Sequence, residues 1–296
     1  DGRVAYNRRF VMRDGTAEMN PGSRLAEVLY REGPIDPEVG VACFQTDALR
    51  TVAVLLHHTC HPVHGYPKRY VSAGWPGAWC DEVKRLFSGQ AVPLVLNGCC
   101  GNVHHADILN RDHVDDPRRM GRLLAETAAR AMEGLRFADA PVLDCRSRRF
   151  GIPLRPLDPE KVKAAQEYMK AHQEPTWKDE AHTLVDREWC YALGMLDLVD
   201  LRRRSPEYEY EVQAFRVGDL AVVALIGEPF VEGQLRIKLE SPAPFTFVAH
   251  MSNGYVGYVP TPEALKRGGY ETRTAHWSKL VPEALDRIAA ETGKVL

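Results

Sequence analysis

Histidine residues are concentrated in one short part of this sequence. Six of the eleven lie between positions 57 and 105, and four of these fall in the segment His-His-Thr-Cys-His-Pro-Val-His, which directly follows an apolar run. Neutral imidazole is a common ligand of zinc and similar metals, and α/β folds bind ligands where strands end. The segment therefore indicates a metal site, with a packed polar network or a chance cluster on the surface as the alternatives. Its four histidines are His57, His58, His61 and His64.

A second group of reactive side chains lies in the segment Asn97–His105, again directly after an apolar run. Its glycines would let the backbone approach a ligand closely, but the Lys-Ser/Thr pair of a phosphate-binding P-loop is absent from it. The adjacent Cys99 and Cys100 are typical of buried core thiols. A thiol-dependent enzyme that uses one of them, with His104 as its base, is an alternative.

Glu228 and three tyrosines follow later apolar runs. Glu228 stands in Gly-Glu-Pro-Phe after Leu220–Ile226. A carboxylate there could ligate a metal, act as a general base or interact with the dipole of the next helix. Tyr255, Tyr258 and Tyr270 are surrounded by glycines. This setting predicts exposed aromatic edges near a site, or ordinary loop anchors.

Strands and helices must alternate to position these side chains. The first forty residues are rich in turn-forming residues and predict an ordered loop region. Beyond them, short apolar runs predict strands and amphipathic stretches predict helices, and Asp116-Pro117 is typical of a helix start. The expected elements are strands at Val39–Gln45, Thr51–His57 and Val92–Leu96, the last of them buried, and helices at Trp79–Phe87 and from Asp116 onward.

The second half of the chain continues this alternation. Gly218-Asp219 between two apolar runs predicts a tight hairpin. The expected elements are strands at Pro141–Ile152, Glu209–Arg216, Leu220–Ile226 and Phe245–Ala249, and helices at 158–172, Glu180–Arg203, Phe230–Leu239 and Lys279–Ala290. The alternation predicts an α/β fold. Since the sequence has no internal repeat and no low-complexity linker, we expect one domain over residues 1–296.

Composition and charge narrow the function further. The 296 residues carry a net charge of −2, from 38 basic and 40 acidic side chains, which gives no reason to expect nucleic acid or anionic lipid as a partner. No apolar run approaches the roughly 18 residues of a membrane helix. The seven cysteines show no C-x-x-C spacing and are typical of buried thiols in a reducing compartment. A cytoplasmic protein and an exported one whose signal has been removed are both consistent with the sequence, and the oligomeric state is open.

Five motifs follow one another along the chain: His-Pro after a strand, Gly-Cys-Cys-Gly-Asn, Gly-Glu-Pro-Phe, Asn-Gly-Tyr-Val-Gly-Tyr-Val-Pro-Thr-Pro-Glu-Ala and Gly-Gly-Tyr-Glu. In this order they resemble the neutral/alkaline, non-lysosomal ceramidase family, and more closely its shorter bacterial ceramidase-like homologues. The similarity extends from Asn7-Arg8 to about Tyr270. The resemblance implies a fold with β-sheets sandwiched between helices. It also implies zinc-dependent hydrolysis of the amide of N-acyl-sphingosine, a step of sphingolipid metabolism.

The resemblance assigns roles to particular residues. The family holds its metal with two histidines, a glutamate and a tyrosine, and His61, Glu228 and Tyr258 match one histidine, the glutamate and the tyrosine. Tyr270 matches a further active-site tyrosine, which would donate to the developing oxyanion or to the leaving nitrogen. Arg8 matches an arginine near the substrate head group.

Two departures from the family pattern affect these assignments. The family's first zinc histidine stands in a His-x-His-Ser-Gly motif upstream of Asn7-Arg8, and this sequence has no such motif. We expect that the chain lacks the N-terminal portion of the catalytic domain, or that another histidine substitutes. The family's Gly-Asp-x-Ser-Pro-Asn corresponds to Gly101–His105, with His104 at the place of a catalytic serine and Asn102 expected at the substrate site. His104 would then act as a general base or as a metal ligand. The candidate substitutes for the missing ligand are His57, His58, His64, His104 and His105.

Together these observations predict a zinc-dependent, ceramidase-like hydrolase that cleaves an amide or related acyl bond by metal-activated water. The expected substrate is a small or lipid-like N-acyl compound. The alternative is a truncated or degenerate homologue that binds a lipid or a glycan and carries out no chemistry.

Overall fold

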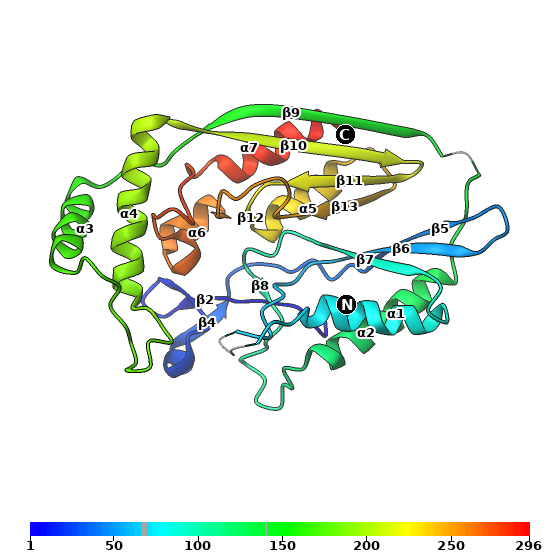
Figure 1. Ribbon diagram of the computed structural model, residues 1–296, viewed down its shortest axis with the longest axis horizontal. Coiled ribbons are helices and arrows are strands. Elements are labelled where there is room, and N and C mark those ends of the chain that lie inside the picture. The colour runs from blue at the N-terminus through cyan, green and yellow to red at the C-terminus, as the bar shows by residue number, and fades with distance from the viewer. Residues whose placement is uncertain (67–69, 140) are drawn as a thin grey trace.

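A three-stranded sheet lies at the centre of one half of the molecule. The computed structural model describes residues 1–66, 70–139 and 141–296. In this sheet β5 and β6 are antiparallel and β6 and β7 are parallel. Helices α1 and α2 pack against it and bury Trp79 and Leu124 in a shared hydrophobic core (Figure 1). These elements are β5 (Gly40–Gln45), β6 (Thr51–His58), β7 (Val92–Asn97), α1 (Gly74–Leu86) and α2 (Pro117–Met132).

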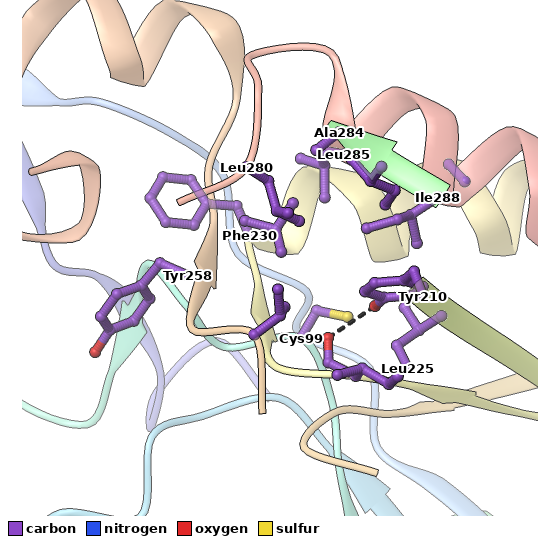
Figure 2. Close-up of a cluster of buried hydrophobic side chains, with 14 of the residues drawn as sticks. Cys99, Tyr210, Leu225, Phe230, Tyr258, Leu280, Ala284, Leu285 and Ile288 are labelled. Carbon is purple, nitrogen blue, oxygen red and sulfur yellow. Dashed lines mark hydrogen bonds between the residues drawn. The ribbon is translucent and has the colours of Figure 1, made fainter. Parts of the chain in front are cut away.

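A four-stranded sheet lies in the other half. Its strand order is β13-β11-β10-β9, with β9, β10 and β11 antiparallel and β11 and β13 parallel. Helices α5 and α7 cover it, and Figure 2 shows Ile288 of α7 packed near Tyr210 and Leu225 of the sheet. The elements are β9 (Leu143–Pro153), β10 (Glu207–Val217), β11 (Leu220–Leu225), β13 (Phe245–Ala249), α5 (Val231–Glu240) and α7 (Ala284–Gly293).

The two sheets meet beside the ends of β7 and β13. There the backbone N–H of His250 donates to Asn97 O at 3.1 Å. The fold is an α/β arrangement in which helices pack on both sheets, as the sequence predicts (Figure 1). In the part of the chain that the structure describes, no helix has the length and apolar character needed to cross a bilayer.

Short strand pairs connect the two halves. β1 pairs with β8, β12 pairs with β14, and β2 lies between β3 and β4. Helices α3 and α4 form a separate hairpin at one end (Figure 1). The elements are β1 (Tyr6–Asn7), β2 (Arg9–Met12), β3 (Ala17–Met19), η1 (Gly22–Glu27), β4 (Val28–Arg31), β8 (Val103–His104), α3 (Pro159–Ala171), α4 (Arg187–Arg204), β12 (Glu228–Pro229), β14 (Tyr258–Val259), α6 (Pro262–Arg267) and η2 (Tyr270–Thr272).

Most of the expected elements are confirmed. The Asp116 side chain accepts hydrogen bonds from the first backbone N–H groups of α2, and β10 and β11 form the expected hairpin. The prediction of a loop region over the first forty residues is wrong, because its turn residues join short strands rather than long irregular segments. The prediction that Val92–Leu96 is a buried strand is also wrong. β7 is an edge strand, and Val92 and Leu94 are 56% and 54% exposed.

Three helices begin at residues other than those expected. α1 begins at Gly74 and not at Trp79, and α4 begins at Arg187, where the Asp186 side chain caps it, and not at Glu180. α7 begins at Ala284 and not at Lys279, because Leu280 is extended and bridges to Leu154. For α4 and α7 the expected range extended into a neighbouring segment that packs in another conformation, whereas α1 is longer at its N-terminus than expected.

Candidate metal and active site

His61 and Glu228 form the centre of the site. His61 follows β6 by three residues, and Glu228 begins β12, which follows β11. Nε2 of His61 lies 3.0 Å from Oε2 of Glu228, and both side chains are largely buried. These two residues are 167 positions apart in the chain. The fold therefore brings together two of the three metal ligands that the sequence predicts.

The contacts of the other ring nitrogen of His61 determine where this imidazole carries its proton. Nδ1 donates to the carbonyl oxygen of Val103 at 3.1 Å and also contacts the carbonyl of Cys100. A neutral imidazole with its proton on Nδ1 has a lone pair on Nε2, so this lone pair faces the Glu228 carboxylate. Two acceptors at this distance require a cation between them, either a proton or a metal ion. A backbone carbonyl that holds the second nitrogen is also the usual support for a metal-ligating histidine.

The charges of this pair depend on each other. Burial alone would lower the pKa of His61, but the neighbouring Cys100 and Glu228 raise it to about 9. Burial would raise the pKa of Glu228, and its hydrogen bond to His61 lowers it below its ordinary value instead. Without a metal, the pair therefore holds a proton between nitrogen and carboxylate at neutral pH.

Tyr258 joins the pair through strand pairing. β12 and β14 are parallel, and their register places Tyr258 opposite Glu228. The Tyr258 and His61 rings have centroids 6.5 Å apart, and Figure 2 shows the Tyr258 phenol directed away from the hydrophobic core. Gly257 has a φ of 82°, and a Cβ there would lie 2.2 Å from the carbonyl oxygen of Trp277. Only glycine therefore allows the chain to enter β14 at this depth.

Arg8, Tyr255 and Tyr270 surround these three residues. The Arg8 guanidinium lies 5.6 Å from the Tyr258 ring centroid, and the Tyr270 ring meets that of Tyr258 edge-on at 5.7 Å. Tyr255 donates a long hydrogen bond of 3.4 Å to Oε1 of Glu228. Sequence reasoning gave Tyr255 no role, although it belongs to the same tyrosine-glycine segment as Tyr258.

His104 lies in β8 and Asn102 directly precedes this strand, and neither side chain bonds to His61 or Glu228 in the described part of the chain. Oδ1 of Asn102 accepts from Val231 N at 2.9 Å, and Nδ2 donates to Glu232 at 2.9 Å, so this side chain caps α5. Nδ1 of His104 accepts from Ala106 N at 2.9 Å. Burial and the adjacent His105 lower the pKa of His104 to about 2. It is a weak base in this setting, and its role in substrate chemistry stays a prediction.

Two other candidate ligands are parts of the interior. His57 stacks on Phe247 with ring centroids 5.0 Å apart, and its Nε2 accepts from Val248 N at 3.2 Å. His58 donates from Nδ1 to the carbonyl oxygen of Glu38 at 2.9 Å. Both side chains are buried, and their contacts join β6 to neighbouring segments. His64 and His105 lie elsewhere, beside Asp115.

The buried state of His57 predicts a pH effect on stability. Burial lowers its pKa from 6.5 to about 3, so between these values the unfolded chain takes up a proton that the native protein does not. The contribution of neutral His57 to the free energy of unfolding is therefore complete above pH 6.5. It is lost as the pH falls, and about 2 kcal/mol has been lost at pH 5. Urea unfolding at pH 7.5 and pH 5 should show a smaller pH difference for His57→Gln than for wild type. The exposed His172→Gln is the control, and equal pH differences in all three proteins would contradict the prediction.

The two adjacent cysteines differ in their surroundings. Cys99 is part of the hydrophobic core around α5 and α7. Sγ of Cys100 lies 3.5 Å from Nε2 of His250, which follows β13, and His104 is not the imidazole paired with it. Burial would raise the pKa of Cys100, but His250 and His61 lower it to about 5. The sequence signal that could have identified His250 is its position directly after the apolar strand Phe245–Ala249.

The Cys100–His250 pair lacks the support that a cysteine nucleophile needs. Asn97 Nδ2 contacts the same His250 Nε2 at 3.3 Å, whereas an orienting partner would hold the opposite nitrogen. Among the described residues, His250 Nδ1 has no hydrogen-bond partner. The Cys100 side chain is also completely buried. The arrangement therefore favours a thiol that borders the His61 site over an independent thiol site.

Comparison with solved structures finds the same fold in ceramidase structures, among them two that superpose over most of this chain. A crystal structure of neutral ceramidase from Pseudomonas aeruginosa superposes with a TM-score of 0.61 at 15% sequence identity, over 88% of this chain and 46% of that chain. A ceramidase complexed with C2 superposes with a TM-score of 0.61 at 14% identity, over 88% of this chain and 47% of that chain. The fold is therefore ceramidase-like, and the chain spans about half the length of these proteins. No family model and no curated protein sequence matches the chain.

Proposed function

We propose that His61, Glu228 and Tyr258 form the metal site of a ceramidase-like hydrolase that cleaves an amide or related acyl bond in a lipid-like N-acyl substrate. The observation that carries the proposal is the approach of His61 Nε2 to Glu228 Oε2, at 3.0 Å. The likeness of the fold to two ceramidases supports the reaction class.

The three side chains fit zinc by their chemistry. One imidazole nitrogen, one carboxylate and one phenol oxygen are three donors of the kind found in catalytic zinc sites, which keep a further position open. Zinc, when bound, would polarise the acyl carbonyl and acidify a water molecule. Because the Val103 carbonyl holds Nδ1 of His61, the ring keeps Nε2 directed at the site without further rearrangement.

The surrounding residues supply binding and proton donors. Tyr270 is 37% exposed, so its phenol is accessible to a substrate, and we assign it the donor role toward the acyl oxygen or the leaving nitrogen. Arg8 donates to Glu271 at 2.8 Å and to the carbonyl of Gly101 at 2.8 Å, which holds its charge beside Tyr258. Positive charge there favours negative charge that develops near the phenol ring.

Metal content and hydrolysis test this function together. Purified protein reconstituted with zinc should hydrolyse a fluorogenic N-acyl amide, and His61→Ala should lose one equivalent of bound zinc along with that activity. His172→Ala, at an exposed histidine, is the control for histidine removal in general. If His61→Ala and wild type bind the same amount of zinc, the proposed site does not exist. Zinc bound at His61 without hydrolysis of any N-acyl substrate would favour the binding-domain alternative.

A further inference from the structure

A second group of metal-ligating side chains lies outside this site. His64 follows β6, His105 follows β8, and Asp115 precedes the N-cap of α2. One ligand atom from each of the three residues lies within 4.8 Å of the other two. In the described part of the chain, none of the three forms a hydrogen bond with His61 or Glu228. The group therefore needs an explanation of its own.

The three side chains converge on one carboxylate oxygen. Oδ1 of Asp115 lies 2.5 Å from Nδ1 of His105 and 3.4 Å from Nε2 of His64. The two imidazole rings are stacked, with centroids 3.5 Å apart and an interplanar angle of 11°. Ligand atoms around a tetrahedral zinc ion lie about 3.3 Å apart, given bonds of about 2.0–2.1 Å. The His64–Asp115 separation matches this value, whereas the His105–Asp115 contact has the length of a hydrogen bond, so an ion would require the half-exposed Asp115 side chain to rotate and the stacked rings to tilt apart.

Burial distinguishes this group from a surface accident. The side chains of His64 and His105 are 4% and 3% exposed, whereas Asp115 is 46% exposed. Nδ1 of His64 and Nε2 of His105 have no hydrogen-bond partner among the described residues. These are the ring nitrogens opposite the two that face Asp115, so they are not ligand atoms of an ion held beside that carboxylate. The exposed carboxylate leaves an entry route from solvent.

We propose that His64, His105 and Asp115 form a second site for a divalent transition-metal ion, distinct from the His61 site. Two imidazole nitrogens and one carboxylate oxygen suit zinc or iron(II), with the remaining positions open to water. The ion would join the segment after β6 to the loop that leads into α2.

A metal-free histidine–aspartate network is the competing explanation. In that case Asp115 would accept hydrogen bonds from one or both rings, and the group would stabilise the fold without binding an ion. The two explanations differ in one measurable respect: only a metal site makes stability depend on the concentration of free metal, since a ligand of the native state stabilises it by mass action.

Zinc stoichiometry of the full chain tests the proposal. Equilibrium dialysis should give two equivalents of zinc for wild type and one for Asp115→Asn, while His61→Ala should lose the other equivalent. Asp115→Asn keeps the shape of a half-exposed side chain, and Asp112→Asn makes the same change at an exposed position of the same loop. The zinc-induced rise in melting temperature should be smaller in Asp115→Asn and unchanged in Asp112→Asn.

Two further outcomes separate this proposal from the hydrolase. One equivalent that disappears in Asp115→Asn but persists in His61→Ala would support the second site and contradict the first. Equal zinc binding by wild type and Asp115→Asn, with equal binding by His64→Gln, would overturn the second site whatever the fate of the first. His64→Gln provides the independent check if Asp115→Asn does not fold, which circular dichroism would reveal.

Discussion

Replacing Glu228 with glutamine is expected to lower kcat/KM for an N-acyl amide by about 100-fold or more. Loss of an outer-shell partner of a metal ligand typically costs 10–100-fold, and Glu228 is proposed as a ligand itself. Glutamine keeps the size of the side chain but removes the negative charge that faces His61 Nε2 at 3.0 Å. The decrease should therefore appear in kcat/KM together with weaker zinc binding. Steady-state kinetics at saturating zinc measures it.

Glu240→Gln is a suitable control because Glu240 lies exposed at the end of α5 and, within the described ranges of the chain, pairs with Arg236 alone. It should leave both kinetics and zinc affinity unchanged. Full activity of Glu228→Gln at low zinc concentration would remove Glu228 from the metal site. If added zinc restores the activity of Glu228→Gln completely, Glu228 contributes to zinc affinity and not to the rate of the zinc-bound enzyme.

Local sequence signals predicted the parts of the fold that depend on local chemistry. Asp116-Pro117 marks the start of α2 because the cap and the proline act within one turn. The β10–β11 hairpin was predictable because Gly218, with a φ of 59°, lies at its turn. By contrast, β1 and β8 are two-residue strands that form only by pairing with each other. Tyr6 pairs with His104 across almost one hundred positions. Such strands carry no periodicity that a sequence pattern could detect.

The candidate site likewise combines features that the sequence predicts with features that depend on contacts between distant segments. Residue types and their places after strands left several histidines and tyrosines open, and it was the resemblance to the ceramidase motifs that singled out His61, Glu228 and Tyr258. Their convergence depends on β12 and β14 pairing in one register, which no spacing in the sequence encodes. His250 and Asp115 were missed for this reason, because each gains a partner only through tertiary contacts with distant segments. The alternation of expected strands and helices predicted the fold class, whereas the contacts between distant residues required the structure.

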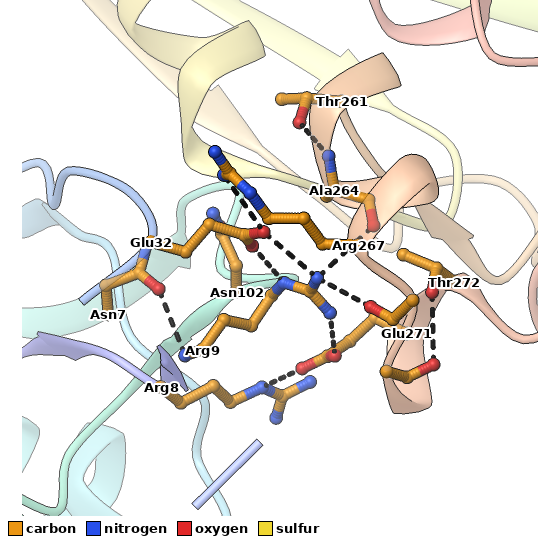
Figure 3. Close-up of polar contacts among 12 residues, drawn as sticks. Asn7, Arg8, Arg9, Glu32, Asn102, Thr261, Ala264, Arg267, Glu271 and Thr272 are labelled. Carbon is orange, nitrogen blue, oxygen red and sulfur yellow. Dashed lines mark hydrogen bonds and ion pairs between the residues drawn. The ribbon is translucent and has the colours of Figure 1, made fainter. Parts of the chain in front are cut away.

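Removing the Glu271 carboxylate should produce a large loss of stability. Glu271 is fully buried and accepts from Nε of Arg8 and from Nη1 of Arg9, each at 2.8 Å (Figure 3). Arg9 is also fully buried and pairs with Glu32. Burial would raise the pKa of Glu271, but the two guanidinium groups lower it, so the carboxylate is ionised at neutral pH. This network connects the start of β2 to η2.

Glu271→Ala is expected to lower the free energy of unfolding by about 3–5 kcal/mol, because it leaves buried positive charge without its counter-ion. Urea denaturation at pH 7 measures the change. Glu271→Gln should cost less, since its amide oxygen still accepts one hydrogen bond. Glu240→Ala, which breaks the exposed pair with Arg236, should cost no more than about 0.5 kcal/mol. A loss for Glu271→Ala as small as that of the exposed pair would show that Arg8 and Arg9 find other partners or water, and that they are not held by Glu271. Since Arg8 lies against Tyr258, the stability of this network and the geometry of the proposed site should change together.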